Sequence, residues 1–184
     1  SGSVLMREVF DCYHALCAGR PVSLPPTRPY RDYIDWLQQE DSAAAETFWR
    51  AELKGFLAPT PLGIGRPLST ATDGVTFYGK EQLQLSAALT SSLTAFARRH
   101  HLTLNTVVQG AYALLLSRYS RQEEILFGIT VSGRPPTLAG SEEMVGLSIN
   151  TLPLLVNVPP TLPLVMWLKQ LQARQIAIQK YHYP

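Results

Sequence analysis

The chain opens with apolar residues at every third or fourth position, a spacing that predicts a first helix over Val4–Ala18. Gly19 and the proline at position 21 end that helix. Four prolines lie between residues 21 and 29. Because proline lacks a backbone donor and has a fixed φ, this segment is expected to run as an extended, fairly stiff connector.

Two shorter helices are predicted after the connector. The first covers Tyr30–Leu37, and the second runs from Asp41, a favoured N-cap residue, to Leu53, with Gly55 beyond its end. A loop punctuated by proline and glycine follows. Alternating apolar and polar residues then predict a strand over Val75–Leu85.

Two capped helices are predicted in the middle of the chain. Ser86 caps a helix that runs to about Arg99, and Thr103 caps another over Leu104–Tyr119. Apolar residues leave the second helix little polar face. This helix is therefore expected to be buried.

The last third of the chain alternates strand and helix patterns. Aliphatic and β-branched runs at Ile125–Val131 and Leu147–Val156 are bounded by turn residues and predict interior strands of a sheet. An amphipathic helix is predicted over Leu162–Lys180. Strands and helices in this order indicate an α/β fold in which helices cover a mixed sheet.

Composition narrows the class of protein. With 184 residues, 46% of them hydrophobic and 16% charged, the chain is expected to form one globular domain or a large lobe of a bigger one. A net charge of +2, from 16 basic and 14 acidic residues spread along the chain, supplies no basic stripe for nucleic acid. The longest apolar runs fall well short of the roughly 20 residues of a membrane span, and no signal-peptide pattern opens the chain.

The two cysteines, Cys12 and Cys17, point in different directions on a helix, so no disulfide is expected between them. Lone thiols suit a reducing cytoplasm, which is the expected location. No CxxC or HxxxH cluster offers convergent ligands, so no metal site is expected.

Three motifs occur in order along the chain. Residues 30–36 read YRDYIDW; residues 48–50 read FWR and precede PTPL at 59–62; residues 145–153 read VGLSINTLP and follow TVSGRP at 130–135. The first motif resembles the YxDYxxW signature, and the third the GxxxNT motif, of condensation domains in non-ribosomal peptide synthetases. With the middle motif, the resemblance covers essentially the whole chain.

The resemblance implies a fold and a reaction. The fold would be a chloramphenicol-acetyltransferase-like α/β lobe, in which residues 1–29 are a helix and crossover from a first lobe and residues 30–184 are the second lobe. The parent enzyme would form an amide bond between aminoacyl or peptidyl thioesters tethered to carrier proteins. Its expected partners are those carrier proteins, an adjacent adenylation domain and the missing N-terminal lobe, with neither nucleic acid nor membrane among them. No cofactor is expected to bind directly, because the carrier proteins would deliver the phosphopantetheine arms.

The family's HHxxxDG motif, whose second histidine assists attack of the acceptor amine, does not occur in the sequence. His100-His101 resembles its start, but Asn105 and Thr106 stand where aspartate and glycine would fall, so the pair is expected to be a helix-end element. No catalytic residue is therefore expected in this chain, which is expected to be inactive by itself. Two alternatives stay open: a non-catalytic lobe that docks carrier proteins, and a related epimerisation or acyltransferase domain of the same fold.

The resemblance gives six candidates for substrate-channel or support roles: Asn150, Thr151, Ser148, Arg134, Asp32 and Trp36. The Asn150 amide lies in an otherwise aliphatic strand and must find hydrogen-bond partners, and a channel role and a purely structural role are equally favoured. Ser148 stands where the family commonly has phenylalanine, and Arg134 favours pairing within the lobe. Trp36 favours core packing.

Asp32 and Asp35 form a pair of acidic candidates. Pairing with Arg28 and Arg31 is favoured over acid–base chemistry, because a catalytic acid needs burial to perturb its pKa. The chain by itself is also expected to expose an apolar face and to self-associate.

Overall fold

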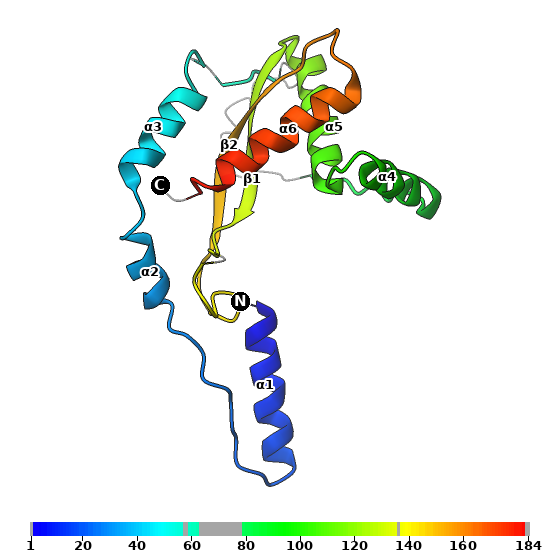
Figure 1. The fold of residues 1–184 in the computed structure, drawn as a ribbon. Coiled ribbons are helices and arrows are strands. Elements are labelled where there is room, and N and C mark those ends of the chain that lie inside the picture. The colour runs from blue at the N-terminus through cyan, green and yellow to red at the C-terminus, as the bar shows by residue number, and fades with distance from the viewer. Residues whose placement is uncertain (1, 57–58, 63–78, 136, 183–184) are drawn as a thin grey trace, which may run out of the picture. The chain divides into compact units, whose positions relative to one another are not determined.

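A computed structural model describes residues 2–56, 59–62, 79–135 and 137–182. Its elements follow in the order α1 (Gly2–Cys17), α2 (Arg31–Leu37), α3 (Ser42–Glu52), α4 (Ala87–Arg99), α5 (Leu104–Ser120), β1 (Glu124–Ser132), β2 (Ile149–Asn157) and α6 (Leu164–Gln179), as Figure 1 shows. All six predicted helices and the last two predicted strands are therefore confirmed, with bounds that differ by a few residues. No helix in the described part of the chain is long and apolar enough to cross a membrane.

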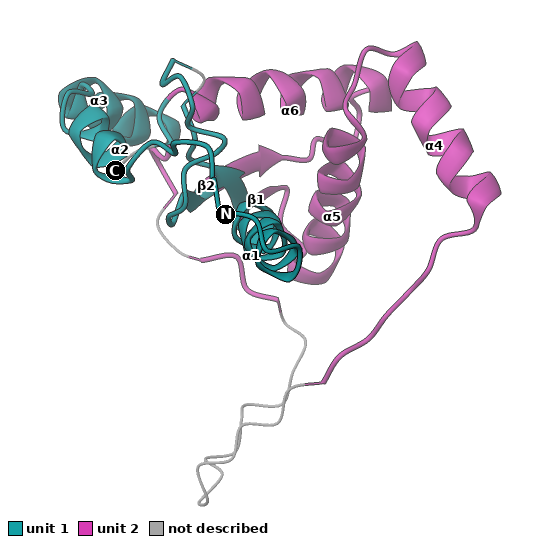
Figure 2. Ribbon diagram, turned by 90° about the horizontal axis from the view of Figure 1, so that it is seen from below, with its two compact units in different colours: residues 1–52, 129–152, 181–184 teal, residues 53–128, 153–180 magenta. Residues whose placement is uncertain are grey.

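The chain divides into two compact units, coloured separately in Figure 2. Unit 1 comprises residues 1–52, 129–152 and 181–184, and unit 2 comprises residues 53–128 and 153–180. Each unit thus contains segments that are distant in sequence, and the residues of both strands are shared between them. The assignment of residues 1–29 and 30–184 to two lobes stays a prediction.

Side-chain caps begin three of the helices where the sequence predicts them. The Asp41 carboxylate accepts the Ala44 N–H at 2.9 Å, Ser86 Oγ accepts the Leu89 N–H at 3.2 Å, and Thr103 Oγ1 accepts the Thr106 N–H at 3.0 Å. Each bond satisfies one of the backbone donors that a first helical turn leaves without an intrahelical partner. Past α3, Gly55 has φ +88, a left-handed conformation that glycine adopts without steric cost.

The sheet is an antiparallel ladder of two strands, so in the described part of the chain neither is the interior strand that the sequence predicts. At one end the Gly133 N–H donates to Ser148 O at 2.5 Å, and at the other the Val158 N–H donates to Glu123 O at 2.7 Å. The end of one strand is therefore paired with the start of the other.

The strand predicted over Val75–Leu85 is wrong where the structure describes it. Residues 75–78 lie outside the described residues, and residues 79–85 form an irregular segment in which every residue is exposed. Leu83, one of the two leucines of this segment, has 88% of its surface exposed. Alternation produces a strand only where one face is buried against neighbours, and residues 79–85 bury none.

In unit 2, α5 packs against α6 through its small residues. Gly110 is buried, and the side chains of Trp167 and Leu168 lie where a Cβ at this position would be. Close to this contact, the Oγ1 of buried Thr106 donates to Gln175 Oε1 at 2.8 Å. Hydrogen bonding of this kind is what allows polar side chains to lie between two helices.

The expectation that α5 is buried is wrong for its outer face. Apolar side chains on that face are 41% to 55% exposed, namely Leu104, Val108, Tyr112, Leu115 and Tyr119. One side of the helix contacts α4 and α6. On the outer face Tyr112 packs edge-on against Phe127 of β1, but about half of the surface of these side chains stays exposed. An all-round apolar pattern indicates that a helix can be buried, but a covering partner is needed to bury it.

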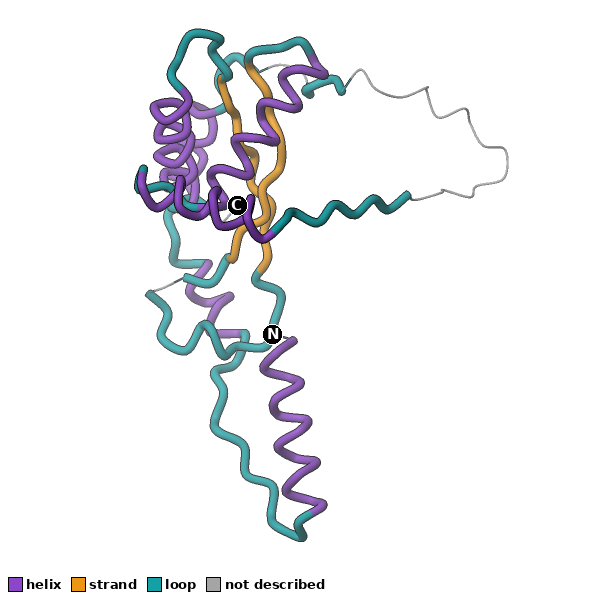
Figure 3. Tube along the Cα trace, turned by 90° about the vertical axis from the view of Figure 1, so that its right-hand side faces the viewer, coloured by secondary structure: helices purple, strands orange, loops and turns teal. Residues whose placement is uncertain are grey.

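In unit 1, the segment between α1 and α2 is an extended loop (Figure 3), as its prolines predict. The helix α1 leaves most of its apolar side chains exposed, with Leu5, Val9, Tyr13 and Leu16 between 46% and 68%. The helix α3 is anchored by Trp49, whose Nε1 donates to Tyr181 O at 3.1 Å. Unit 1 therefore combines a well-packed part with an uncovered first helix.

Candidate functional site

Aromatic rings from α2 and from the end of the chain form a continuous row in unit 1. Tyr30, Tyr33 and Trp36 follow one another at three-residue spacing, which places them on one side of the helix. Their ring centroids are 5.4 Å apart for Tyr30–Tyr33 and 6.0 Å for Tyr33–Trp36, and His182 stacks on Trp36 at 6.2 Å. Trp36 thus stacks between Tyr33 and His182 but is only half-buried, so it is not the core residue that the sequence predicts.

Both the nitrogen and the oxygen of the Asn150 side-chain amide form hydrogen bonds with backbone groups. Its Nδ2 donates to His182 O at 2.5 Å, and its Oδ1 accepts the Thr151 N–H at 2.8 Å. The expectation that this amide must find partners is confirmed, and both of these partners are main-chain groups. Asn150 therefore ties the start of β2 to the residues that follow α6.

Arg134 and Ser148 lie at the other end of the aromatic row. The Arg134 guanidinium donates to Ser141 O and, at 2.9 Å, to Met144 O, which confirms that it pairs within the chain. With Tyr30, Tyr33 and Gly146, these residues line a cavity of about 10 Å³. A cavity of this size holds about one water molecule, so it is too small for a substrate.

Asp32 and Asp35 pair with arginines, as predicted. Asp32 accepts from Arg28 Nε at 2.6 Å, while Asp35 lies 3.9 Å from Arg31 Nε on the exposed side of α2. Arg28 also donates through Nη1 to Ala139 O at 2.8 Å. The Arg28–Asp32 pair is therefore linked to a loop distant in sequence, whereas Arg31 and Asp35 both lie on α2.

Burial raises the pKa of the Tyr33 phenol, and the neighbouring Tyr30 raises it further. A raised pKa keeps this hydroxyl protonated and uncharged in the folded protein. Its oxygen would lie 3.1 Å from a Cβ at Gly133, which shows how closely the ring approaches the backbone beside β1.

The histidine pair at 100–101 ends α4. The His101 N–H donates to Arg98 O at 3.2 Å and the Leu102 N–H donates to Ala97 O at 2.8 Å, with His101 at φ +57. Leu102 and Ala97 are both buried. This is the Schellman arrangement of a helix C-terminus, and it supports the prediction that the pair is a helix-end element.

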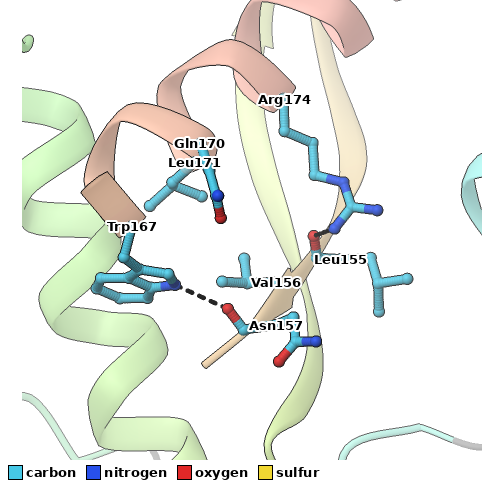
Figure 4. Close-up of a pocket in the computed structure, with 7 residues that line it drawn as sticks. All are labelled: Leu155, Val156, Asn157, Trp167, Gln170, Leu171 and Arg174. Carbon is cyan, nitrogen blue, oxygen red and sulfur yellow. Dashed lines mark hydrogen bonds between the residues drawn. The ribbon is translucent and has the colours of Figure 1, made fainter. Parts of the chain in front are cut away.

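A separate hollow of about 240 Å³ lies in unit 2, between β2 and one face of α6 (Figure 4). Trp167 Nε1 donates to Asn157 O at 2.7 Å, and Arg174 Nη1 donates to Leu155 O at 2.6 Å. These two polar groups of the lining thus hold the protein's own strand. None of the six residues predicted from the sequence lies there.

All six predicted residues belong to unit 1, and the structure links them through neighbours that were not singled out for a functional role. Tyr30 and Tyr33 belong to the first motif and could have been found from their spacing with Trp36. The pairing of Arg28 with Asp32 was predicted, but the bond from Arg28 to Ala139 and the contacts of His182 carried no local signal, because those partners are distant in sequence. The resulting cluster, which we name the α2–β2 cluster, comprises Arg28, Tyr30, Asp32, Tyr33, Trp36, Arg134, Ser148, Asn150, Thr151 and His182.

The sequence matches the family model described as Condensation domain over residues 1–184. A linear gramicidin synthase polypeptide of Brevibacillus parabrevis is 48% identical over 176 residues, which cover 96% of this chain and 4% of that protein. Surfactin synthase subunit 3 of Bacillus subtilis (strain 168) is 37% identical over 181 residues, covering 98% of this chain and 14% of that protein. The chain thus spans a small part of the length of these relatives.

Solved structures share the fold. The X-domain from teicoplanin biosynthesis matches with a TM-score of 0.78 at 24% identity, covering 98% of this chain and 42% of that chain. The first condensation domain of the CDA synthetase matches with a TM-score of 0.73 at 19% identity, covering 93% of this chain and 38% of that chain. The predicted fold class, an α/β lobe of the chloramphenicol-acetyltransferase-like type, is thereby confirmed.

Proposed function

The chain belongs to the condensation-domain family, and from this membership we propose that it is part of an enzyme that joins two carrier-tethered building blocks through an amide bond. The observation that carries the proposal is the match of the family model to residues 1–184. The α2–β2 cluster supports it, because the residues of the two most specific motifs lie together there.

In the proposed reaction the amine nitrogen of the acceptor attacks the thioester carbonyl carbon of the donor. A C–N bond forms, the C–S bond breaks, and the phosphopantetheine thiol of the donor carrier leaves. The attacking amine loses a proton, which is the step that a general base assists. The chain has four histidines. His14 is exposed on α1 beside Phe10 and Tyr13, His100-His101 is a helix C-terminus and His182 stacks on Trp36, so we place the general base outside residues 1–184.

The chain's own residues would then serve as supports. Asn150, Thr151 and Ser148 would present the start of β2 to the substrate channel, while Arg134, Asp32 and Trp36 would hold the surrounding backbone. The proposed partners are aminoacyl and peptidyl carrier proteins, an adjacent adenylation domain and a first lobe to which residues 1–29 belong. The proposed location is the cytoplasm.

The test compares this chain with the intact protein that contains it. Both are incubated with donor and acceptor carrier proteins loaded with aminoacyl thioesters, and the amide product is measured by mass spectrometry. We expect turnover by the intact protein and background product from residues 1–184, because general acid–base assistance alone is worth about 10²- to 10⁴-fold.

Three other outcomes would change the proposal. Turnover by residues 1–184 well above background would place the reacting groups inside this chain. Binding of loaded carriers by the intact protein without any product would favour a docking lobe. Inversion of the donor's α-carbon without amide formation would favour an epimerisation domain.

A further inference from the structure

The loop of residues 138–147 is held through its backbone by three side chains. Four of its carbonyl oxygens accept side-chain hydrogen bonds, from Arg28 to Ala139, from Arg134 to Ser141 and Met144, and from Tyr30 to Leu147. Two of these three side chains, Arg28 and Tyr30, come from the end of the proline-rich connector, more than 100 residues away in sequence. This loop leads directly into Ser148 and Asn150.

Two hydrogen bonds, from different nitrogens, hold the Arg28 guanidinium. Its Nε is 2.6 Å from the Asp32 carboxylate, and its Nη1 donates to Ala139 O at 2.8 Å. Because the guanidinium is planar and its donors have fixed directions, the carboxylate on α2 sets the direction in which Nη1 points. Gly140, the next residue of the loop, has φ +77, so the chain turns sharply where Arg28 holds it.

Tyr30 holds the other end of the same loop. Its hydroxyl donates to Leu147 O at 2.5 Å, and its ring covers Gly146 so closely that a Cβ there would overlap the ring. Beyond this contact, Leu147 and Ile149 are 76% and 67% exposed, and they alternate with Ser148 and Asn150. In an extended segment such alternate residues point to opposite sides.

We infer that Arg28 and Tyr30 are positioning residues, which fix the loop of residues 138–147 and so set where the start of β2, with the exposed Leu147 and Ile149, is presented to substrate. This inference rests on the proposed function. Productive geometry is sensitive to small shifts, since a misplacement of about 1 Å can cost roughly 100-fold in rate. On this inference the loop positions the reacting groups and does not bind the carrier proteins, so loosening it should lower kcat and leave KM for the carrier proteins unchanged.

The main variant is Arg28→Met in the intact protein, with Arg31→Met as its matched control. Both arginines lie beside the first turn of α2 and pair with an aspartate four residues on, but only Arg28 reaches the loop. We expect Arg28→Met to lower kcat about tenfold and to increase hydrogen exchange across residues 138–147, and Arg31→Met to leave both unchanged. Arg28→Lys should give an intermediate kcat, because one ammonium cannot reproduce two divergent donors.

Tyr30→Phe is the second variant and keeps the ring over Gly146. It removes only the hydroxyl bond to Leu147, so kcat should fall about threefold and KM should again be unchanged. An equal kcat for Arg28→Met and Arg31→Met would overturn the inference, as would a rise in KM without a fall in kcat. An intact wild-type protein that forms no amide would instead overturn the proposed function, and the positioning roles with it.

Discussion

His101 occupies a conformation that disfavours its own side chain. Its φ of +57 lies in the left-handed region, where the Cβ of an L-residue approaches the following carbonyl oxygen. The hydrogen bonds of the α4 C-terminus and the burial of Leu102 hold the backbone there despite this cost. Glycine, which has no Cβ, adopts the same conformation without it.

We therefore expect His101→Gly to raise the free energy of unfolding by about 1 kcal/mol. His100→Gly is the comparison variant and should lower the free energy of unfolding, because φ at His100 is −102, glycine there loosens the unfolded chain, and the ring contact with Phe96 is lost. Urea unfolding monitored by circular dichroism measures both variants. A loss of stability in His101→Gly would show that the imidazole makes contacts that outweigh the backbone cost.

At the residue scale, the sequence predicted which side chains require a hydrogen-bond partner better than it predicted which residue that partner is. An amide in an aliphatic strand requires hydrogen bonds, and Asn150 has them, but no pattern indicated that His182 O would accept one. The pairing of Asp32 with Arg28 was predictable because the two residues are only four positions apart. The bond from Arg28 to Ala139 was not, because it depends on how a loop far along the chain returns.

Elements whose limits are set by their own residues were predicted best. Asp41, Ser86 and Thr103 cap helices where expected, since each cap involves residues only three apart. The outer face of α5 and the segment 79–85 were predicted wrongly, because burial and strand pairing both depend on a neighbouring element. Local chemistry sets where an element begins, and tertiary contacts set which face it buries.

The contact between α5 and α6 gives a prediction at this scale. Replacing Gly110 by alanine raises helix propensity by about 1 kcal/mol, but the new Cβ would lie 2.5 Å from Leu168 Cδ2 and 3.3 Å from the Trp167 ring. Overpacking of this kind costs about 1 to 3 kcal/mol, so we expect Gly110→Ala to lower the free energy of unfolding.

Ala111→Leu is the matched control for this variant, because it adds bulk at the next helical position, which is exposed. Its unfolding midpoint in urea should stay close to that of the wild type. A Gly110→Ala protein more stable than the wild type would show that α6 moves aside at little cost.

At the scale of the whole molecule, both units expose apolar helix surface. In unit 1 the uncovered residues belong to α1, where Val9 is 57% exposed, and in unit 2 they belong to α5, where Val108 is 55% exposed. Single exposed apolar residues are ordinary on a protein surface, but contiguous rows of them mark sites of association. The sequence predicted an exposed apolar face through the family resemblance, whereas the two helices that carry it emerged only from the structure.

We expect residues 1–184 on their own to self-associate as the protein concentration rises. Light scattering over a concentration series should show an increasing mean mass, and Val9→Glu combined with Val108→Glu should reduce the increase. Both substituted side chains are more than half exposed, so the glutamates remain in water and the fold is retained. A monomer at every concentration would contradict this prediction.

The hydrogen bonds that Trp167 and Arg174 donate to β2 restrict how such an assembly can form. The backbone N–H of Val158 points toward β1. Because backbone groups alternate in direction along a strand, those of Leu155 and Asn157 point to the opposite edge, where their carbonyl oxygens already accept side-chain donors. Pro153 on the same edge has no N–H to offer. A foreign strand would have to break two bonds to join there, so this border of the sheet resists the edge-to-edge stacking that leads to fibrils.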